Sequence, residues 1–421
     1  MIIIYKIVEL SNGIRVVYEK IDFVDSVTTG VWIGTGSAME SELNNGVSHY
    51  LEHMFFKGTE RFGAKEIAER IENLGGQLNA LTAKEYTCFY DKVLSEHVEQ
   101  AVDTLADMLL YSKFSEKDLE LERKVILEEI NMSEDTPEEL IHDLIAESVW
   151  QNHPLGRPIT GTAESLKKIN RQTLLTYYQK QYHPENIIIS MVGNFDANQL
   201  PDLMEEKFGQ WHPKREFINC PSSERVQSGE RILIKDTEQC QLCLGMKGLC
   251  RNDEDYYALQ IINAILGGNM SSRLFQSVRE EAGLAYSVYS YHNSYSCDGM
   301  FVIYAGLNTE NLENALRLIN REICTLKKNK LSEQEIAVAK TQLKSSLIMG
   351  LESMSARMSH LGKNLLLRGF VPSSAEIMRK IEQVDAQAIN RVIERVFNRD
   401  SLNLALVGRV EEKNYRDLMN Y

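Results

Sequence analysis

The second half of this chain repeats the first half at a nearly constant distance along the sequence. The segment VEQAV at residues 98–102 is echoed by LENAL at 312–316, which begins 214 residues later. The segment SEKDL at 115–119 is echoed by SEQEI at 332–336, which begins 217 residues later. A chain of 421 residues is long enough for two domains. The repeat therefore predicts two domains built on one fold.

Each half also closes on an apolar, strand-like run, at residues 187–193 and 402–408. Between the halves, the polar stretch 210–229 contains prolines and adjacent serines and predicts a domain boundary. We expect an N-terminal domain over residues 1–215 and a homologous C-terminal domain over residues 216–421. Helical and strand-like patterns in each half favour the α+β class, with a mostly antiparallel sheet covered by a helical layer in each domain.

The charge and hydropathy of the chain exclude several classes of protein. A formal net charge of −14, from 46 basic and 60 acidic residues, argues against nucleic acid as a partner. No apolar run reaches the roughly 18 residues of a membrane span. The N-terminus lacks a basic region and leads into Asn12-Gly13, which predicts a folded hairpin rather than a signal peptide.

Seven cysteines are scattered along the chain, which favours a reducing compartment, and we expect a cytoplasmic protein. Cys240 and Cys243 have the spacing of a metal or redox pair, but they stand in an alternating apolar run typical of a strand. Residues three apart on a strand face opposite ways, so a structural role is favoured for both.

A His-x-x-Glu-His motif at His49, Glu52 and His53 carries the candidate chemistry. On a helix, residues four apart share one face, so both imidazoles can reach one metal ion. A catalytic zinc site needs a third protein ligand and one open position for water. Glu52 can lie beside the metal and accept a proton from that water. This inverted order is the inverzincin pattern.

A third ligand is available on a later segment, residues 115–130, which reads as a long helix capped by serine. Glu122 and Glu129 are two helical turns apart and share a face. One of them can bind the metal while the other orients a histidine from beside the site. Glu128 lies about 100° around the helix from Glu129 and should point elsewhere.

Together these motifs resemble the signature of the M16 zinc peptidases, the family of pitrilysin and mitochondrial processing peptidase, in its short, two-domain bacterial form. The match includes the segment ERKVILEE, from Glu122 to Glu129. The resemblance implies the family's fold, an M16/LuxS-like metallohydrolase fold, and one Zn²⁺ per chain. It also implies roles for single residues: metal ligands His49, His53 and Glu129, general base Glu52, and catalytic support from Glu122.

Two further segments resemble substrate-binding parts of the family. The run GGQLNALT at 75–82 is similar to its edge strand, which implies that Asn79 and Ala80 bind an extended peptide by strand addition. The run 271–286 is similar to its second signature, which implies that Arg279 and Tyr286 bind substrate and assist oxyanion formation. From the residues alone, three plainer interpretations remain open: an ordinary strand at 77–82, an Arg279 paired with a glutamate, and a Tyr286 packed in a strand.

The C-terminal half lacks the metal-binding residues. At the 217-residue offset, Glu122 corresponds to Ala339 and Glu129 to Ser346, and the region near 260–264 has no histidine pair. By resemblance, a two-domain member pairs with a second copy into a closed chamber, so a homodimer is expected. The predicted function is a zinc endopeptidase that hydrolyses peptides or unfolded protein segments. A noncatalytic scaffold subunit of the same family and a structural zinc protein remain the alternatives.

Overall fold

The computed structural model describes residues 4–211, 228–329 and 331–421, which form two compact units. The first unit comprises Met1–Ile130, Pro158–Asn219 and Ile348–Ser374, and the second comprises Asn131–Arg157, Cys220–Leu347 and Ala375–Tyr421. The boundary expected at residues 215 and 216 lies outside the described residues. Each unit takes one segment from the other half of the sequence.

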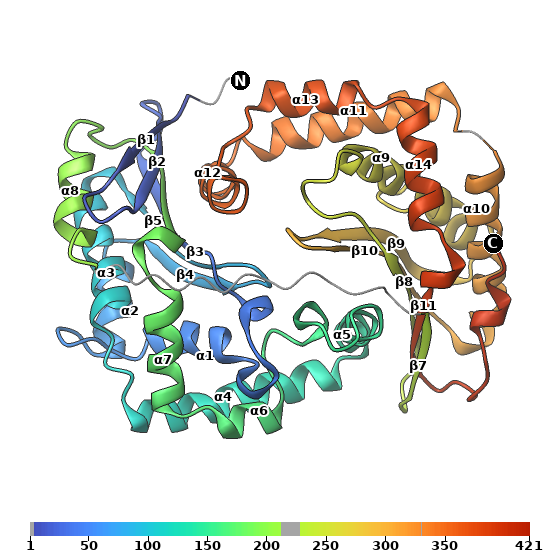
Figure 1. The fold of residues 1–421 in the computed structure, drawn as a ribbon, viewed down its shortest axis with the longest axis horizontal. Coiled ribbons are helices and arrows are strands. Elements are labelled where there is room, and N and C mark those ends of the chain that lie inside the picture. Colours follow the sequence, from blue (N-terminus) through green and yellow to red (C-terminus); the bar gives the residue numbers. More distant parts are fainter. Residues whose placement is uncertain (1–3, 212–227, 330) are drawn as a thin grey trace. The chain divides into compact units, whose positions relative to one another are not determined.

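The first unit contains a six-stranded sheet in the order β1-β2-β6-β3-β5-β4. Figure 1 labels β1 to β5 of this sheet. Only β2 and β6 pair in parallel, and the other neighbours are antiparallel. The predicted N-terminal hairpin is formed by β1 and β2. The strands are β1 (Lys6–Glu9), β2 (Arg15–Lys20), β3 (Ser26–Ile33), β4 (Gln77–Thr82), β5 (Thr87–Leu94) and β6 (Ile187–Gly193).

Helices pack on both faces of this sheet. Val31 and Ile33 of β3 point into the main core, to which seven helices contribute buried side chains. The neighbouring Gly30 faces the other way, where a Cβ atom would lie 2.4 Å from Sδ of Met358 on α12 (Met354–Arg368). The core helices are α1 (Val47–Phe55), α2 (Ala64–Glu72), α3 (Val98–Tyr111), α4 (Glu116–Asp135), α6 (Ala163–Lys168), α7 (Arg171–Gln181) and α8 (Leu200–Phe208).

The second unit contains a five-stranded sheet in the order β7-β11-β8-β10-β9, again with one parallel pair, β7 with β11. Its strands are β7 (Gly229–Ile234), β8 (Cys240–Lys247), β9 (Ala285–Ser294), β10 (Gly299–Leu307) and β11 (Asn403–Gly408). Its helices are α5 (Pro137–Val149), α9 (Tyr256–Leu266), α10 (Leu312–Lys328), α11 (Glu333–Gly350), α13 (Ser374–Glu382) and α14 (Ala386–Val396). No helix within the described ranges has the length and apolar character needed to cross a bilayer.

The two sheets share one strand order, since β2-β6-β3-β5-β4 is matched position by position by β7-β11-β8-β10-β9. The α+β class predicted from the sequence is confirmed. One pair of helices is exchanged between the halves. Helix α5 follows the long α4 but packs on β8 and β11, whereas α12 follows the long α11 and packs on β3 and β6. Local sequence patterns do not indicate this exchange, because it depends on contacts between residues far apart in the chain.

A buried ion pair fixes α12 to the first sheet. Arg357 Nη1 lies 2.6 Å from Oε1 of Glu19 on β2, and the side chains are only 2% and 6% exposed. Arg357 Nε also donates to the carbonyl of Leu351. A buried charge that loses its partner is strongly destabilising, whereas an apolar pair at the same place is tolerated.

We therefore predict that Arg357→Met lowers the free energy of unfolding by about 3–5 kcal/mol, because it leaves the Glu19 carboxylate buried and unpaired. The double variant Glu19→Met/Arg357→Met should recover most of that loss. Urea unfolding followed by circular dichroism measures both. If the double variant is as unstable as the single one, the loss comes from packing and not from the unpaired charge.

Candidate metal centre

Helix α1 carries the His-x-x-Glu-His motif and is fixed at its start by a buried carboxylate. Glu40 accepts hydrogen bonds from the backbone N–H groups of Gly46 (2.7 Å) and Ser48 (2.8 Å). An anion at this position satisfies free N–H groups and complements the positive end of the helix dipole. Gly46 has a φ of +94°, which favours glycine, and a Cβ there would lie 2.7 Å from the carbonyl oxygen of Thr160.

The three residues predicted as ligands lie together. Nε2 of His49 is 3.7 Å and Nε2 of His53 is 3.6 Å from Oε2 of Glu129 on α4. One ligand atom from each of the three residues lies within 4.8 Å of the other two. Ligands at about 2.1 Å from a tetrahedral zinc ion are roughly 3.4 Å apart, so these three side chains fit such an ion. Burial and the nearby His53 lower the pKa of His49 to about 4, which leaves its imidazole neutral at pH 7.

Glu122 and Glu128 behave differently on α4. Glu122 is buried, and its Oε2 lies 3.0 Å from Nδ1 of His53. A carboxylate at this position accepts a hydrogen bond from Nδ1–H and thereby directs the unprotonated Nε2 of the same ring towards a metal. Glu128 is exposed, although it is adjacent to Glu129. Helical spacing thus places Glu122 and Glu129 beside the histidines of α1 and leaves Glu128 exposed, while the roles of these glutamates at a metal stay predictions.

Glu52 lies beside the cluster and is anchored by the edge strand. Its Oε2 accepts a hydrogen bond of 2.5 Å from the hydroxyl of Thr82, the last residue of β4. Burial raises the pKa of Glu52 above its ordinary value, although the Thr82 hydrogen bond opposes the shift. No sequence pattern indicates Thr82, because its contact with Glu52 of α1 arises only when β4 packs against that helix.

Strand β4 is an edge strand, paired on one side with β5. The Ala83 N–H closes the hairpin onto the Tyr86 carbonyl, so by alternation the Ala80 N–H points away from β5. That N–H instead donates to Oδ1 of the neighbouring Asn79, at 2.8 Å. Among the described residues, the free edge of β4 therefore presents backbone groups that pair with no other strand.

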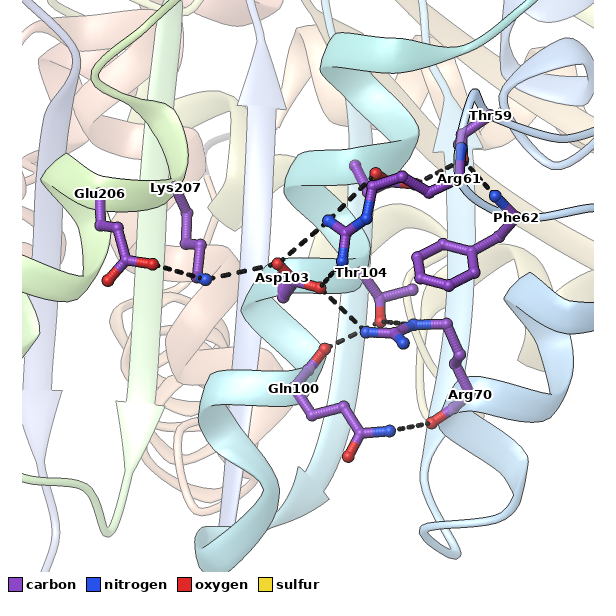
Figure 2. Close-up of polar contacts among 10 residues, drawn as sticks. Thr59, Arg61, Phe62, Arg70, Gln100, Asp103, Thr104, Glu206 and Lys207 are labelled. Atoms are coloured by element: carbon purple, nitrogen blue, oxygen red, sulfur yellow. Dashed lines mark hydrogen bonds and ion pairs between the residues drawn. The ribbon is translucent and has the colours of Figure 1, made fainter.

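The connection from α1 to α2 is anchored to α3 by two aspartates. Thr59 donates from its hydroxyl to Oδ2 of Asp107 at 2.5 Å, and the Arg61 guanidinium lies 3.3 Å from Oδ1 of the same residue. Figure 2 shows the second aspartate, Asp103, between three cations from different elements. These cations are Arg61, Arg70 and Lys207. The segment that follows the two histidines is thus held at a fixed position.

Arg279 and Tyr286 belong to the second unit. The Arg279 guanidinium lies over the rings of Phe275 (4.8 Å) and Tyr286 (5.3 Å), and its Nε is 3.6 Å from Glu280. Tyr286, near the start of β9, is 76% exposed. The two residues contact one another, and the Tyr286 ring is available to a partner or substrate.

Other features of the second unit agree with structural roles. Cys240 and Cys243 are buried and unpaired, with Cys240 in the core and Cys243 near His142 of α5. Ala339, at the position that corresponds to Glu122, is also buried. In the described part of the chain, the His49, His53 and Glu129 group is the one cluster suited to a metal ion.

Comparison with known proteins agrees with this geometry. Residues 15–163 match the family model described as insulinase (peptidase family M16), and residues 168–343 match the model of the peptidase M16 inactive domain. The chain belongs to the M16 peptidase family. An M16 relative from Bacillus subtilis, the uncharacterized zinc protease YmxG, is 44% identical, with 94% of this chain and 96% of the relative covered. An uncharacterized zinc protease of Streptomyces coelicolor is 36% identical, with 96% and 89% covered.

Solved structures show the same M16 fold. A peptidase M16 inactive domain from Pseudomonas fluorescens superposes with a TM-score of 0.89 at 21% identity, covering 96% of this chain and 98% of that one. A protease from Helicobacter pylori superposes with a TM-score of 0.90 at 21% identity, covering 97% and 100%. The description of the second family model as inactive is consistent with the described residues of that region, among which no metal-binding cluster is found.

Removal of single carboxylates on α4 should affect metal affinity in a fixed order. We predict that Glu129→Gln weakens zinc binding by more than about 100-fold, since loss of an outer partner alone costs about 10–100-fold. Glu122→Gln should fall in that lower range, and Glu128→Gln should bind like wild type. Chelator competition measures all three dissociation constants. If Glu128→Gln loses as much zinc affinity as Glu129→Gln, the assignment of Glu129 as the third ligand is wrong.

Proposed function

We propose that this M16 protein is a zinc-dependent endopeptidase that hydrolyses peptides or unfolded protein segments. The observation that carries the proposal is the convergence of His49, His53 and Glu129, with Glu52 beside them and outside the ligand group. Three protein ligands leave a fourth position open for water, which is the arrangement of a catalytic rather than a structural zinc site. The zinc protease names of the relatives support the same choice of metal.

In the proposed mechanism, Glu52 is the general base. A bound zinc ion supplies Lewis-acid chemistry, which lowers the pKa of a water molecule and polarises a peptide carbonyl. Glu52 takes a proton from the attacking water and passes it to the leaving amine as the peptide bond breaks. Thr82 occupies one oxygen of Glu52 and leaves the other for this proton. Glu122 keeps His53 in orientation throughout.

The substrate is proposed to bind as an added strand on β4. The outward N–H of Ala80 then donates to a substrate carbonyl in place of Oδ1 of Asn79, and the released Asn79 amide contacts the peptide. Main-chain hydrogen bonds of this kind are independent of side chains, so they suit a peptidase that accepts varied sequences. Arg279 and Tyr286 are proposed to bind substrate carbonyls and to stabilise the oxyanion.

The same proposal includes a homodimer that encloses a chamber and a cytoplasmic location in a bacterium. The dimer follows from the resemblance to two-domain M16 members. The relatives described above are bacterial, and the buried, unpaired thiols of Cys240 and Cys243 suit a reducing compartment. A noncatalytic scaffold subunit is the second candidate, but it has no need of a general base or of three convergent ligands.

Glu52→Gln tests the enzyme directly. We predict that cleavage of a mixed peptide pool, followed by mass spectrometry, falls by about 10²–10⁴-fold, because the substitution removes the base and keeps the ligands. Bound zinc, measured on the same preparations, should be unchanged. Equal cutting by both proteins would exclude Glu52 as the base. If neither protein cuts although zinc is bound, the scaffold becomes the better description.

Ala80→Pro tests strand addition. Proline removes the outward N–H and leaves the pairing of β4 with β5, so we predict a loss in kcat/KM of up to about tenfold, the worth of one hydrogen bond. Ala80→Gly keeps the N–H and should cleave like wild type. Zinc affinity should be the same in all three proteins. Full activity of the proline variant would remove Ala80 from the substrate site.

A further inference from the structure

Lys57 continues the row of metal-facing residues on α1. His49, His53 and Lys57 are spaced four residues apart, and helical spacing places such residues on one face. Helix α1 ends at Phe55, but the Lys57 N–H still bonds the carbonyl of Met54, so the turn carries this lysine onwards. Its side chain therefore faces α4, as the two histidines do.

The ammonium group of Lys57 contacts the carboxylate that supports His53. Lys57 Nζ lies 2.7 Å from Oε1 of Glu122, and the other oxygen of Glu122 lies 3.0 Å from Nδ1 of His53. The Glu122 side chain is 7% exposed, whereas that of Lys57 is 33% exposed. Both carboxylate oxygens are thus occupied, one by a cation and one by the imidazole. This leaves the Glu122 side chain little freedom to rotate.

We propose that Lys57 is a positioning residue for the metal centre, which fixes the orientation of Glu122 and, through it, the imidazole of His53. The inference rests on the proposed zinc site. Outer partners of metal-binding histidines set ring orientation and contribute to metal affinity. Lys57 acts one contact further out, and it touches neither the ligand atoms nor any reacting group.

Two observations support a dedicated role. Gly58 has a φ of +121°, and the next residue, Thr59, is tied to Asp107 of α3, so the backbone around Lys57 is fixed. The C-terminal half also lacks the Lys57–Glu122 pair. Lys57 is the second residue after α1, and the second residue after the corresponding helix α9 is Gly268. Ala339 occupies the position that corresponds to Glu122. The lysine, the glutamate and the histidines are absent together.

The test compares zinc affinity, measured by chelator competition, in Lys57→Met, Lys57→Arg and wild type. We expect about tenfold weaker binding in Lys57→Met, the lower end of the range for outer partners, and recovery of most of the affinity in Lys57→Arg. Lys65→Met is the matched control, because it removes an exposed ion pair with Glu69 on α2 that touches no metal ligand. Its zinc affinity should equal that of wild type.

Thermal melting of the zinc-free proteins separates positioning from folding. Lys57→Met leaves the buried Glu122 with His53 as its partner, so we expect its zinc-free form to fold but to melt below wild type. If it does not fold, Lys57→Gln, which keeps a donor towards Glu122, replaces it in the comparison. Wild-type affinity in the folded lysine variants overturns the proposal, as does equal loss in Lys65→Met. If wild type binds zinc but cleaves no peptide, the proposed function fails while the effect of Lys57 on affinity can still be measured.

Discussion

The buried carboxylate of Glu122 is the constraint on which the metal centre depends. A carboxylate that is shielded from water must be paired, and Glu122 meets this requirement with Lys57 on one oxygen and His53 on the other. The His53 contact joins α1 to α4 across 69 positions of the sequence. The two ends of α1 are fixed separately, by Glu40 before the helix and by Asp107 after it. The histidines therefore lie on a helix whose position and rotation are both determined.

The repeated fold explains why one unit can carry the chemistry while the other keeps only the architecture. Both sheets use the same strand order, but the helix that covers the second face of each sheet comes from the opposite half of the chain. Neither half of the sequence supplies the helix that covers the second face of its own sheet. The Arg357–Glu19 contact is one that holds the first sheet to a helix from the other half of the chain. The predicted ligands His49, His53 and Glu129 take no part in it. The second unit keeps the same strand order with Ala339 and Ser346 at the positions that correspond to Glu122 and Glu129.

Local periodicity predicted much of this structure, and its limits are physical. The spacing of His49 and His53, and of Glu122 and Glu129, reports which residues share a helical face. The structure brings His49, His53 and Glu129 together, and their role as ligands stays a prediction. Thr82 gave no such signal, since its contact with Glu52 requires β4 to pack on α1. Lys57 stands four residues after His53, but this spacing alone does not indicate its contact with Glu122, which lies on another helix. The exchange of α5 and α12 is likewise a long-range contact, which periodicity cannot report.

Thr82 links the proposed substrate strand to the proposed base. It is the last residue of β4, its hydroxyl holds Glu52, and its backbone follows Ala80 on the same outward-facing register. A peptide that adds to β4 would therefore end its pairing beside the carboxylate that takes the proton. Binding energy from backbone pairing would then position the scissile bond whatever the side chains are. In this arrangement, sequence tolerance and catalytic alignment follow from the same strand.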